Sequence, residues 1–530
     1  MREPAEKTYP MAEAVRQAYR RGEDDETMLP LVRTDGRKTP IGKIQNGDYV
    51  IFYDIRGERE IQLTQAFTEE GFSHFAAEPG LRAHFATMIQ YDPDLNVRVA
   101  FPPVERISDT LCEVVTRNAF RLARISESEK AVHIGYFLGG RRDERFPGED
   151  RVVVPSPEHE VNYDEVPEMS AAGVTEAVIE KIKDPEYGLI IANFANVDVV
   201  GHIENEPAIL KAVEAADAQV GVVVETAREV GLYTIVTADH GTVEKWLYPE
   251  GAIDTGHTNS PVPFSLIVPL PDERGLEIRG NGGLADVAPT VLDILGLKKP
   301  AAMTGESLLV EFDGPGKKPR VLLVIVDGWG YNDDTYGNLI AKANTPVMDR
   351  LMKDHPFATL AASGEAVGMP AGAVGNSESG HLHLGAGRTV HSDRTRIDRA
   401  IEDGSYMENE AFAWAMEGAK RDGKRLHLLG IISFYSSHGS IDHLLPLMQM
   451  AKDRAVPEVY IHGLLGRRGE RPESGARYIG RVEAEAEDIG LGEVATVIGR
   501  YWALDREQNW DRVEKTYRAL VHGEGAPVKT

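Results

Sequence analysis

Cysteine is almost absent from this sequence, which contains one such residue, Cys112, in 530 positions. One thiol cannot form a disulfide within the chain, so small folds held together by a disulfide framework are excluded. We expect Cys112 to be a buried small side chain. We also expect the protein to work in a reducing cytoplasm, where structural disulfides are rare.

Long hydrophobic runs are also missing. No stretch reaches the roughly 18 apolar residues of a transmembrane helix, and the first residues lack the apolar run of a signal peptide. Acidic residues outnumber basic ones, because the sequence has 84 acidic and 58 basic residues, which give a net charge of −26. This balance disfavours nucleic acid and anionic membranes as general partners, although it leaves room for a local basic pocket.

Short apolar runs that alternate with amphipathic stretches are abundant. Their number favours an α/β fold with mainly parallel sheets, and the length favours two domains at roughly 100–200 residues each. The runs that predict strands cover residues 187–194, 232–238, 321–326 and 426–432. We expect helices over residues 12–19 and 510–521, with polar loops beyond both of them.

Chemically useful side chains follow several of the predicted strands. Asp327 follows residues 321–326, and Asp239 and His240 follow residues 232–238. Loops at the carboxyl ends of parallel strands usually carry the chemistry of α/β proteins. A lone aspartate at such a position is nevertheless more often a cap or turn residue, so each residue by itself is weak support for a site.

Four further residues widen this set. Asp198 lies four positions before His202, a spacing that puts both on one face of a helix, where a carboxylate and an imidazole could grip one ion. His257 lies in a polar loop, and Ser377 lies in a Gly-flanked stretch. Taken alone, a loop histidine such as His257 is usually an exposed side chain.

Together, the three aspartates, three histidines and the serine form a mixed oxygen and nitrogen donor set. Such a set suits two divalent cations, for example Mn²⁺, Zn²⁺ or Co²⁺. A serine hydroxyl is a poor nucleophile at neutral pH, but coordination to a metal favours its alkoxide. The combination therefore predicts phosphoryl transfer through a phosphoserine at Ser377.

Five segments around these residues resemble the metal motifs of cofactor-independent phosphoglycerate mutase, a family of the alkaline phosphatase superfamily: VDGWG, GNSESGH, NFANVDVVGH, TADHG and GHTNSPVPF. Similar segments extend over most of the chain. The resemblance implies an alkaline-phosphatase-like domain and a second α/β phosphotransferase domain. It also implies two divalent ions, foremost Mn²⁺, and interconversion of 3-phosphoglycerate and 2-phosphoglycerate in glycolysis and gluconeogenesis, without 2,3-bisphosphoglycerate.

The resemblance assigns roles to individual residues. Around one ion it places Asp327, Ser377, Asp239 and His240. Around the other it places Asp198, His202 and His257. The substrate's phosphate and carboxylate need cations, which the planar arginine fork matches well. The positions that match the family's substrate-binding residues are His438, Arg468, Arg500, Arg506, Arg56, Arg59 and Lys130. Without the resemblance, most of these are ordinary surface charges.

The order of the motifs differs from that of the family, because TADHG precedes VDGWG here and follows it there. The sequence resembles a circular permutant whose old ends are joined through the Pro/Gly/Lys-rich residues 313–319. The alternative is that the chain belongs to a family in which this order is usual. That alternative changes no chemical inference. We expect the phosphatase-like domain to cover residues 106–391. The substrate-binding transferase domain would combine residues 1–105 with 392–530.

Several departures from the family lie in the expected transferase domain. Next to Arg468, Gly469 replaces the aspartate that holds the glycerate hydroxyls in the family, and Gly439 and Ser440 replace a serine and a second histidine. If glycerate is held poorly, water attacks the phosphoserine instead. Three functions stay open: the mutase, a metal-dependent phosphatase acting on a related phosphomonoester, and a non-catalytic sensor. We expect a monomer, since enclosing a small substrate needs no partner subunit.

Overall fold

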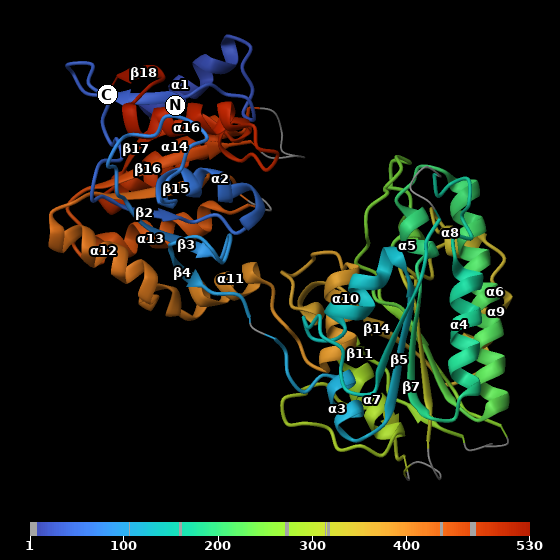
Figure 1. Ribbon diagram of the computed structural model, residues 1–530. Coiled ribbons are helices and arrows are strands. Elements are labelled where there is room, and N and C mark those ends of the chain that lie inside the picture. The colour runs from blue at the N-terminus through green and yellow to red at the C-terminus, as the bar shows by residue number, and fades with distance from the viewer. Residues whose placement is uncertain are drawn as a thin grey trace, which may run out of the picture. The chain divides into compact units, whose positions relative to one another are not determined.

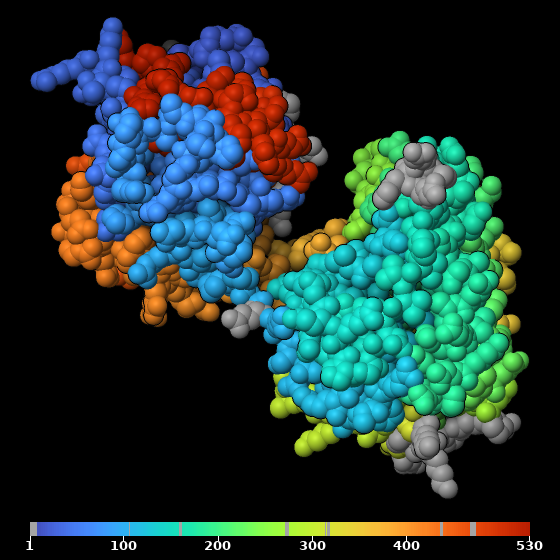
Figure 2. Space-filling model, in the orientation of Figure 1, coloured from blue at the N-terminus to red at the C-terminus, as the bar shows by residue number. Residues whose placement is uncertain are grey.

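The computed structural model divides the chain into two compact units. Unit 1 combines Met1–Pro103 with Asp393–Thr530, and unit 2 is Val104–Ser392. The structure describes residues 8–104, 106–157, 162–270, 275–312, 314, 319–434, 438–466 and 473–529. Most of the expected linker at 313–319 lies outside these ranges. Unit 1 is assembled from both chain ends, whose blue and red surfaces adjoin in Figure 2.

Unit 2 is built on an eight-stranded sheet with the order β11-β14-β9-β8-β13-β7-β5-β6. Its central strand β13 (Val321–Val326) pairs in parallel with β7 (Tyr187–Phe194) and β8 (Tyr233–Thr237). Every residue of these three strands is buried, as expected for parallel strands covered on both faces. β9 (Val262–Ile267) is the exception in direction, because it runs antiparallel to both neighbours.

Helices cover both faces of this sheet. One face carries α4 (Ala171–Lys183), α6 (Glu206–Val230) and α9 (Pro346–Asp354), where α6 packs against both of the other helices (Figure 1). The opposite side carries α3 (Leu111–Arg117), α7 (Val287–Ile294) and α10 (Ser377–Ala386). The remaining elements are β5 (Arg121–Glu127), β6 (Glu149–Val154), β11 (Gly282–Gly283), β14 (Phe357–Ala361), the ribbon of β10 (Glu277–Ile278) and β12 (Leu309–Val310), α5 (Asn196–Gly201) and α8 (Leu339–Lys342).

Unit 1 also contains an eight-stranded sheet, in the order β18-β1-β17-β16-β15-β2-β3-β4. Its central strand β15 (Leu426–Ile431) pairs in parallel with β2 (Tyr49–Phe52) and with β16 (Val459–Leu465). Beyond β2 lie β3 (His84–Ile89) and β4 (Arg98–Phe101), and next to β16 lies β17 (Glu493–Gly499). The sequence prediction of α/β architecture with mainly parallel sheets is therefore confirmed in both units.

The helices of unit 1 pack on this second sheet and enclose its core. They are α1 (Pro10–Arg20), α2 (Gly57–Thr68), α11 (Asp393–Asp403), α12 (Glu410–Asp422), α13 (Ile441–Asp453), α14 (Gly475–Ile489), α15 (Arg500–Ala503) and α16 (Trp510–His522). Cys112 is buried in the other core, that of unit 2, as predicted. Within the described ranges, no helix is both long and apolar enough to cross a bilayer.

The last residues of the chain correct one prediction. They do not form a polar loop after α16, because Ala526–Lys529 is a strand, β18, that pairs in parallel with β1 (Leu31–Thr34). Only Val528 of this strand is buried, so the sequence has no alternation of apolar and polar residues that would predict the strand. Its pairing partner lies at the opposite end of the sequence, where a local pattern cannot detect it.

The buried centre of the unit 2 sheet predicts a large cost for shortening a side chain there. Leu323 in β13 is 0% exposed, and Leu323→Ala should lower the free energy of unfolding by about 2–5 kcal/mol, measured by urea denaturation. The matched control is Leu270→Ala, because Leu270 is 50% exposed. It should change the free energy by less than about 0.5 kcal/mol. Equal effects at both positions would contradict this assignment of the core.

Candidate metal centre

The carboxyl ends of β7, β13 and β8 bring three aspartates together at one edge of the unit 2 sheet. Asp327 comes directly after β13, Asp239 follows β8, and Asp198 lies in the first turn of α5, just after β7. Backbone hydrogen bonds fix their positions, since Asp327 N donates to Phe194 O at 3.0 Å and Asp198 N donates to Asp327 O at 3.1 Å. All three side chains are buried.

Two glycines allow this close approach. Gly328 has a φ of +80°, and a Cβ there would lie 2.8 Å from the backbone nitrogen of Asp198. Gly380 in α10 faces Asp239, and a Cβ there would lie 2.4 Å from the Asp239 carbonyl oxygen. Larger side chains at these positions would therefore force the carboxylates apart.

Ser377 is the first residue of α10, so its hydroxyl lies at the positive end of the helix dipole. The Asn376 side chain caps the helix by accepting a hydrogen bond from Ser379 N at 2.8 Å. Ser377 Oγ donates to Asp327 Oδ1 at 3.1 Å and lies 3.0 Å from His240 Nε2. The predicted nucleophile thus lies among the predicted metal ligands.

Lys130 also lies in this cluster, in the short helical turn Ser128–Lys130. Its ammonium donates to Asp198 Oδ2 and to Asp327 Oδ1, both at 2.6 Å, and to Ser377 Oγ at 2.8 Å. Burial opposes the charged form, but the carboxylates outweigh it and raise the pKa of Lys130. Burial also opposes the charged form of Asp327 and by itself would raise the pKa of this carboxyl. The Lys130 charge nevertheless holds the pKa of Asp327 far below its usual value.

The histidines of the cluster turn one ring nitrogen toward the carboxylates. Nε2 of His202 and Nε2 of His257 lie 3.3 Å and 3.2 Å from Asp198 Oδ1. Their Nδ1 atoms face backbone carbonyls, at 2.7 Å from Thr255 O and 2.9 Å from Gly375 O. Because a carbonyl only accepts, each Nδ1 carries a hydrogen, so the neutral form of each ring would offer the Nε2 lone pair to a metal ion, the usual arrangement of a metal-ligating histidine.

His381 is a candidate ligand that sequence reasoning missed. Possible ligand atoms of Asp239, Asp327 and His381 lie within 4.8 Å of one another, as do those of Asp198, His240 and His257. The signal was available, because His381 ends the GNSESGH motif four residues after Ser377, on the same helical face. His240 Nε2 lies between the two groups, 3.6 Å from Asp198 Oδ1 and 3.5 Å from Asp327 Oδ1. Which ion each residue binds therefore stays a prediction.

The charge of the cluster fits divalent cations. Burial disfavours a charged imidazole, yet Asp239, Asp198 and Asp327 together raise the pKa of His240 to about 10, which shows how strongly the site attracts positive charge. Asp239 Oδ2 is buried and accepts no hydrogen bond in the described part of the chain, although His381 Nδ1 lies 3.1 Å from it. Carboxylate oxygens and imidazole nitrogens of this kind suit Mn²⁺, Zn²⁺ and Co²⁺.

The predicted substrate-binding arginines gather in unit 1, around the start of α2 and around α15. Glu58 bridges two of them, with Oε1 at 2.6 Å from Arg56 and Oε2 at 2.7 Å from Arg506. Burial, followed by the charges of Arg506, Arg500 and Arg56, lowers the pKa of Arg59, so the four guanidinium groups are close enough to repel one another. Such a concentration of positive charge suits a phosphate or carboxylate.

The other predicted substrate residues divide between the two units. His438 belongs to unit 1, where its side chain is 2% exposed and its Nδ1 lies 2.8 Å from Glu60 Oε1. Lys130 belongs to unit 2, at the serine. Arg468 and Gly469 lie outside the described residues. A cavity of about 110 Å³ in unit 1 is lined by Arg59 and Arg500, among other residues.

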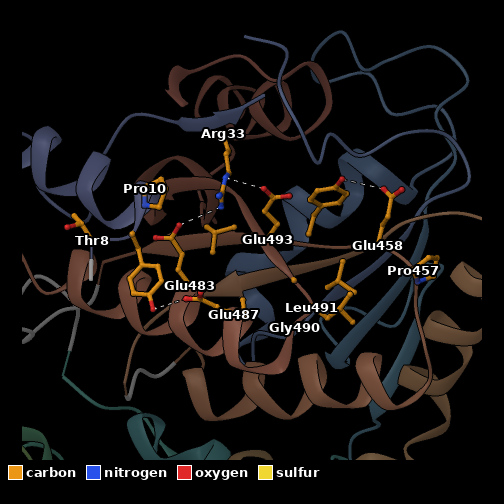
Figure 3. Close-up of a pocket in the computed structure, with 16 residues that line it drawn as sticks. Thr8, Pro10, Arg33, Pro457, Glu458, Glu483, Glu487, Gly490, Leu491 and Glu493 are labelled. Atoms are coloured by element: carbon orange, nitrogen blue, oxygen red, sulfur yellow. Dashed lines mark hydrogen bonds and ion pairs between the residues drawn. The ribbon is translucent and has the colours of Figure 1, made fainter. Parts of the chain in front are cut away.

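A larger groove of about 600 Å³ in unit 1 lies elsewhere (Figure 3). Its charged lining is mainly acidic, with Glu458, Glu483, Glu487 and Glu493 against Arg33. Arg33 is largely neutralised there, because its guanidinium lies 3.6 Å from Glu483 and 3.3 Å from Glu493. None of the predicted substrate residues that the structure describes lines this groove, and its charge disfavours a phosphate.

The excess of buried carboxylate predicts stabilisation by divalent metal. Mn²⁺ at 100 times its dissociation constant should stabilise the protein by about 2.7 kcal/mol, seen as a rise in melting temperature. Asp239→Asn should reduce this rise, because it removes a charged ligand. Asp354→Asn is the control, since Asp354 is an exposed residue at the end of α9. An equal metal-induced rise in both variants would contradict the site.

Comparisons with known proteins match parts of the chain to two family models and to curated relatives. Residues 37–299 match the metalloenzyme superfamily, and residues 397–530 match the N-terminal region of BPG-independent phosphoglycerate mutase. The chain is 42% identical over 299 residues to the 2,3-bisphosphoglycerate-independent phosphoglycerate mutase of Listeria monocytogenes and 43% identical over 299 residues to that of Syntrophotalea carbinolica. Each alignment covers 56% of this chain, which spans 57% of the length of either relative.

A solved structure is also similar in sequence. It is a crystal structure of Leishmania mexicana phosphoglycerate mutase at low cobalt concentration, 30% identical in sequence, and the match covers 52% of this chain and 53% of that one. Its TM-score of 0.38 is too low to establish a common overall fold. The metalloenzyme match and the donor set together imply divalent metal ions. Over the parts that these comparisons align, the chain is similar to 2,3-bisphosphoglycerate-independent phosphoglycerate mutases.

Proposed function

We propose that this protein interconverts 3-phosphoglycerate and 2-phosphoglycerate through a phosphoserine at Ser377. The observation that carries the proposal is the surroundings of Ser377 Oγ, which lies 2.8 Å from Lys130 Nζ, 3.0 Å from His240 Nε2 and 3.1 Å from Asp327 Oδ1. The curated relatives are named for this activity, and the chain spans 57% of their length. A monomeric state and a cytoplasmic location stay predictions.

Divalent ions, with Mn²⁺ as the first choice and Zn²⁺ or Co²⁺ as alternatives, belong to the proposal. The residues that would hold them are Asp198, His202 and His257 for one ion and Asp239, His240, Asp327 and Ser377 for the other. When bound, such ions supply positive charge that favours the serine alkoxide and offsets the charge of the phosphoryl oxygens. Because the serine itself carries the phosphoryl group, the reaction needs no 2,3-bisphosphoglycerate.

The residues of the chain account for the other requirements of the transfer. Ser377 Oγ forms the new bond to phosphorus while the bond from phosphorus to the glycerate oxygen breaks. The Ser377 hydroxyl loses its proton as this bond forms, the departing glycerate oxygen gains one, and Lys130 Nζ, which lies 2.8 Å from Oγ, keeps Oγ in place. Return of the phosphoryl group to the other hydroxyl of glycerate completes the isomerisation.

Substrate recognition is assigned to the basic residues of unit 1. The residues proposed to bind phosphate and carboxylate are Arg56, Arg59, Arg500 and Arg506, with Lys130 of unit 2 beside the serine. His438 and Arg468 would steer the glycerate. Guanidinium groups suit this task because they bind both anions in a bidentate manner and stay charged.

Phosphorus NMR of the protein with Mn²⁺ and 3-phosphoglycerate tests the proposal. The expected product is 2-phosphoglycerate, and Ser377→Ala should lower its rate of formation more than about 10³-fold, because no phosphoserine can form. Ser379→Ala on the same helix is the control and should keep the activity, since the capping N–H of this residue remains. If inorganic phosphate is the only product, the protein is a phosphatase and not a mutase. Normal turnover by Ser377→Ala would contradict the serine mechanism.

We also propose that the chain is a circular permutant of the family order. In support, β13 lies between β7 and β8 in the sheet although it follows both in sequence, and both chain ends belong to unit 1. A permuted order also limits any collinear alignment to part of each relative, as the 57% coverage would require.

Reversing the permutation tests this interpretation. A variant that joins Thr530 to Met1 through a short Gly/Ser linker and opens new ends after Gly314 should fold, with a melting temperature close to that of the parent. A control with the same linker but opened between Leu323 and Val324 interrupts β13 and should fail to fold. If both variants fail, the proposed old junction is wrong.

A further inference from the structure

Three buried titratable side chains form a second cluster in unit 1. Asp54 and Glu60 are 0% exposed and His438 is 2% exposed, and possible ligand atoms of the three lie within 4.8 Å of one another. His438 Nδ1 lies 2.8 Å from Glu60 Oε1. Neither carboxylate belongs to the metal centre, and neither takes part in the function proposed above.

The fold makes room for the Asp54 carboxylate. Asp54 comes shortly after β2, and its Oδ1 accepts a hydrogen bond from Ile431 N, at the end of β15, at 2.7 Å. A Cβ at Gly430 would lie 2.7 Å from this oxygen, and a Cβ at Gly439 would lie 3.3 Å from it. Gly439, which departs from the family's serine, is thus one of two glycines beside a buried carboxylate.

A structural role explains Glu60 only in part. Glu60 lies in the first turn of α2, where its Oε2 accepts a hydrogen bond from Arg59 N at 3.2 Å, as a residue near a helix N-terminus often does. This role does not explain why a second carboxylate lies beside it. Asp54 Oδ2 is buried and receives no hydrogen bond from the described residues, and the neighbouring Glu60 can bond to Asp54 only if one of the two carries a proton.

Burial of the cluster favours such a proton. Burial, followed by the charge of Glu60, raises the pKa of Asp54 well above its usual value, and burial raises the pKa of Glu60 to about 8. Burial lowers the pKa of His438 to about 4, with the Asp54 charge opposing and the arginine charges adding to the effect. The charged and titratable groups that face the cluster are Arg56, Arg59, Arg500, Tyr53 and Tyr91.

We propose that Asp54 and Glu60 are positioning residues that retain a proton and, through the Glu60–His438 hydrogen bond, determine which ring nitrogen of His438 carries its hydrogen. With Glu60 protonated, Oε1–H donates to Nδ1, and the hydrogen of the neutral ring is on Nε2. When Nε2 gives that proton to an acceptor, Nδ1 takes the proton of Glu60, so the ring stays neutral and Glu60 becomes a carboxylate. The reverse transfer restores the first state.

This relay rests on the proposed function, in which glycerate oxygens need a proton when the phosphoryl group leaves and must lose one when it returns. The imidazole passes the proton without becoming charged among the arginines, where an imidazolium would be repelled. Burial keeps Glu60 protonated near neutral pH, and Asp54 also keeps its proton, because burial and the Glu60 charge raise the pKa of Asp54 well above its usual value.

Glu60→Gln separates this role from a structural one. The amide keeps an oxygen that can accept from Arg59 N but cannot release a proton. Glu69→Gln is the matched control, because Glu69 is an exposed glutamate at the end of the same helix. In full-length protein with ¹³C-labelled histidine, the His438 signal is identified by its absence in His438→Gln. In the parent and the control it should show a change of neutral tautomer near pH 8, and in Glu60→Gln this change should disappear.

Turnover supplies the second measurement. Glu60→Gln should lower kcat by about 10²–10⁴-fold with little change in KM, and the pH profile should lose its step near pH 8. An unchanged His438 titration or an unchanged pH profile in Glu60→Gln would overturn the relay. Loss of one bound divalent ion per chain would overturn it as well and identify a metal site instead. If no variant turns over phosphoglycerate, the proposed function fails, and the NMR titration alone decides whether the proton is shared.

Discussion

The accumulation of negative charge at the carboxyl edge of the unit 2 sheet is the constraint on which the rest of the structure depends. Parallel pairing of β13 with β7 and β8 makes three chain segments end side by side, and each supplies a buried aspartate. Carboxylates so close together in a buried site are unfavourable without cations. The Lys130 ammonium, which contacts two of them and the serine hydroxyl, supplies part of the compensation.

The two units resolve buried charge in different ways. In unit 2 the carboxylates face Lys130 and a ring of histidines whose Nε2 atoms turn inward, a donor set for divalent ions. In unit 1 the carboxylates of Asp54 and Glu60 lie near arginines, and the proposed compensation there is a retained proton. The same type of side chain is therefore proposed to serve metal binding in one unit and proton handling in the other, because its neighbours differ.

Local patterns predict much of this architecture. The apolar runs 187–194 and 321–326 have the bounds of β7 and β13, because continuous burial on both sheet faces leaves a continuous hydrophobic signal. The structure also brings Asp327, Asp239, Asp198 and Ser377 into mutual contact or near contact, as parallel strands with chemistry at their carboxyl ends require. By contrast, β18 leaves no such signal, since it buries one residue and pairs with a strand from the other end of the chain.

The sequence by itself determined the α/β class, the central strands and the set of residues available for metal and phosphate chemistry, because these depend on local hydrophobic periodicity and on motif spacing. Only the tertiary structure decided that Lys130 contacts the serine, that His381 joins the ligand cluster, and that Asp54 and Glu60 lie beside His438. These contacts join residues whose proximity follows from strand order and from the space left by Gly328, Gly380 and Gly430. No local pattern encodes them, since each depends on which segments the sheets bring together.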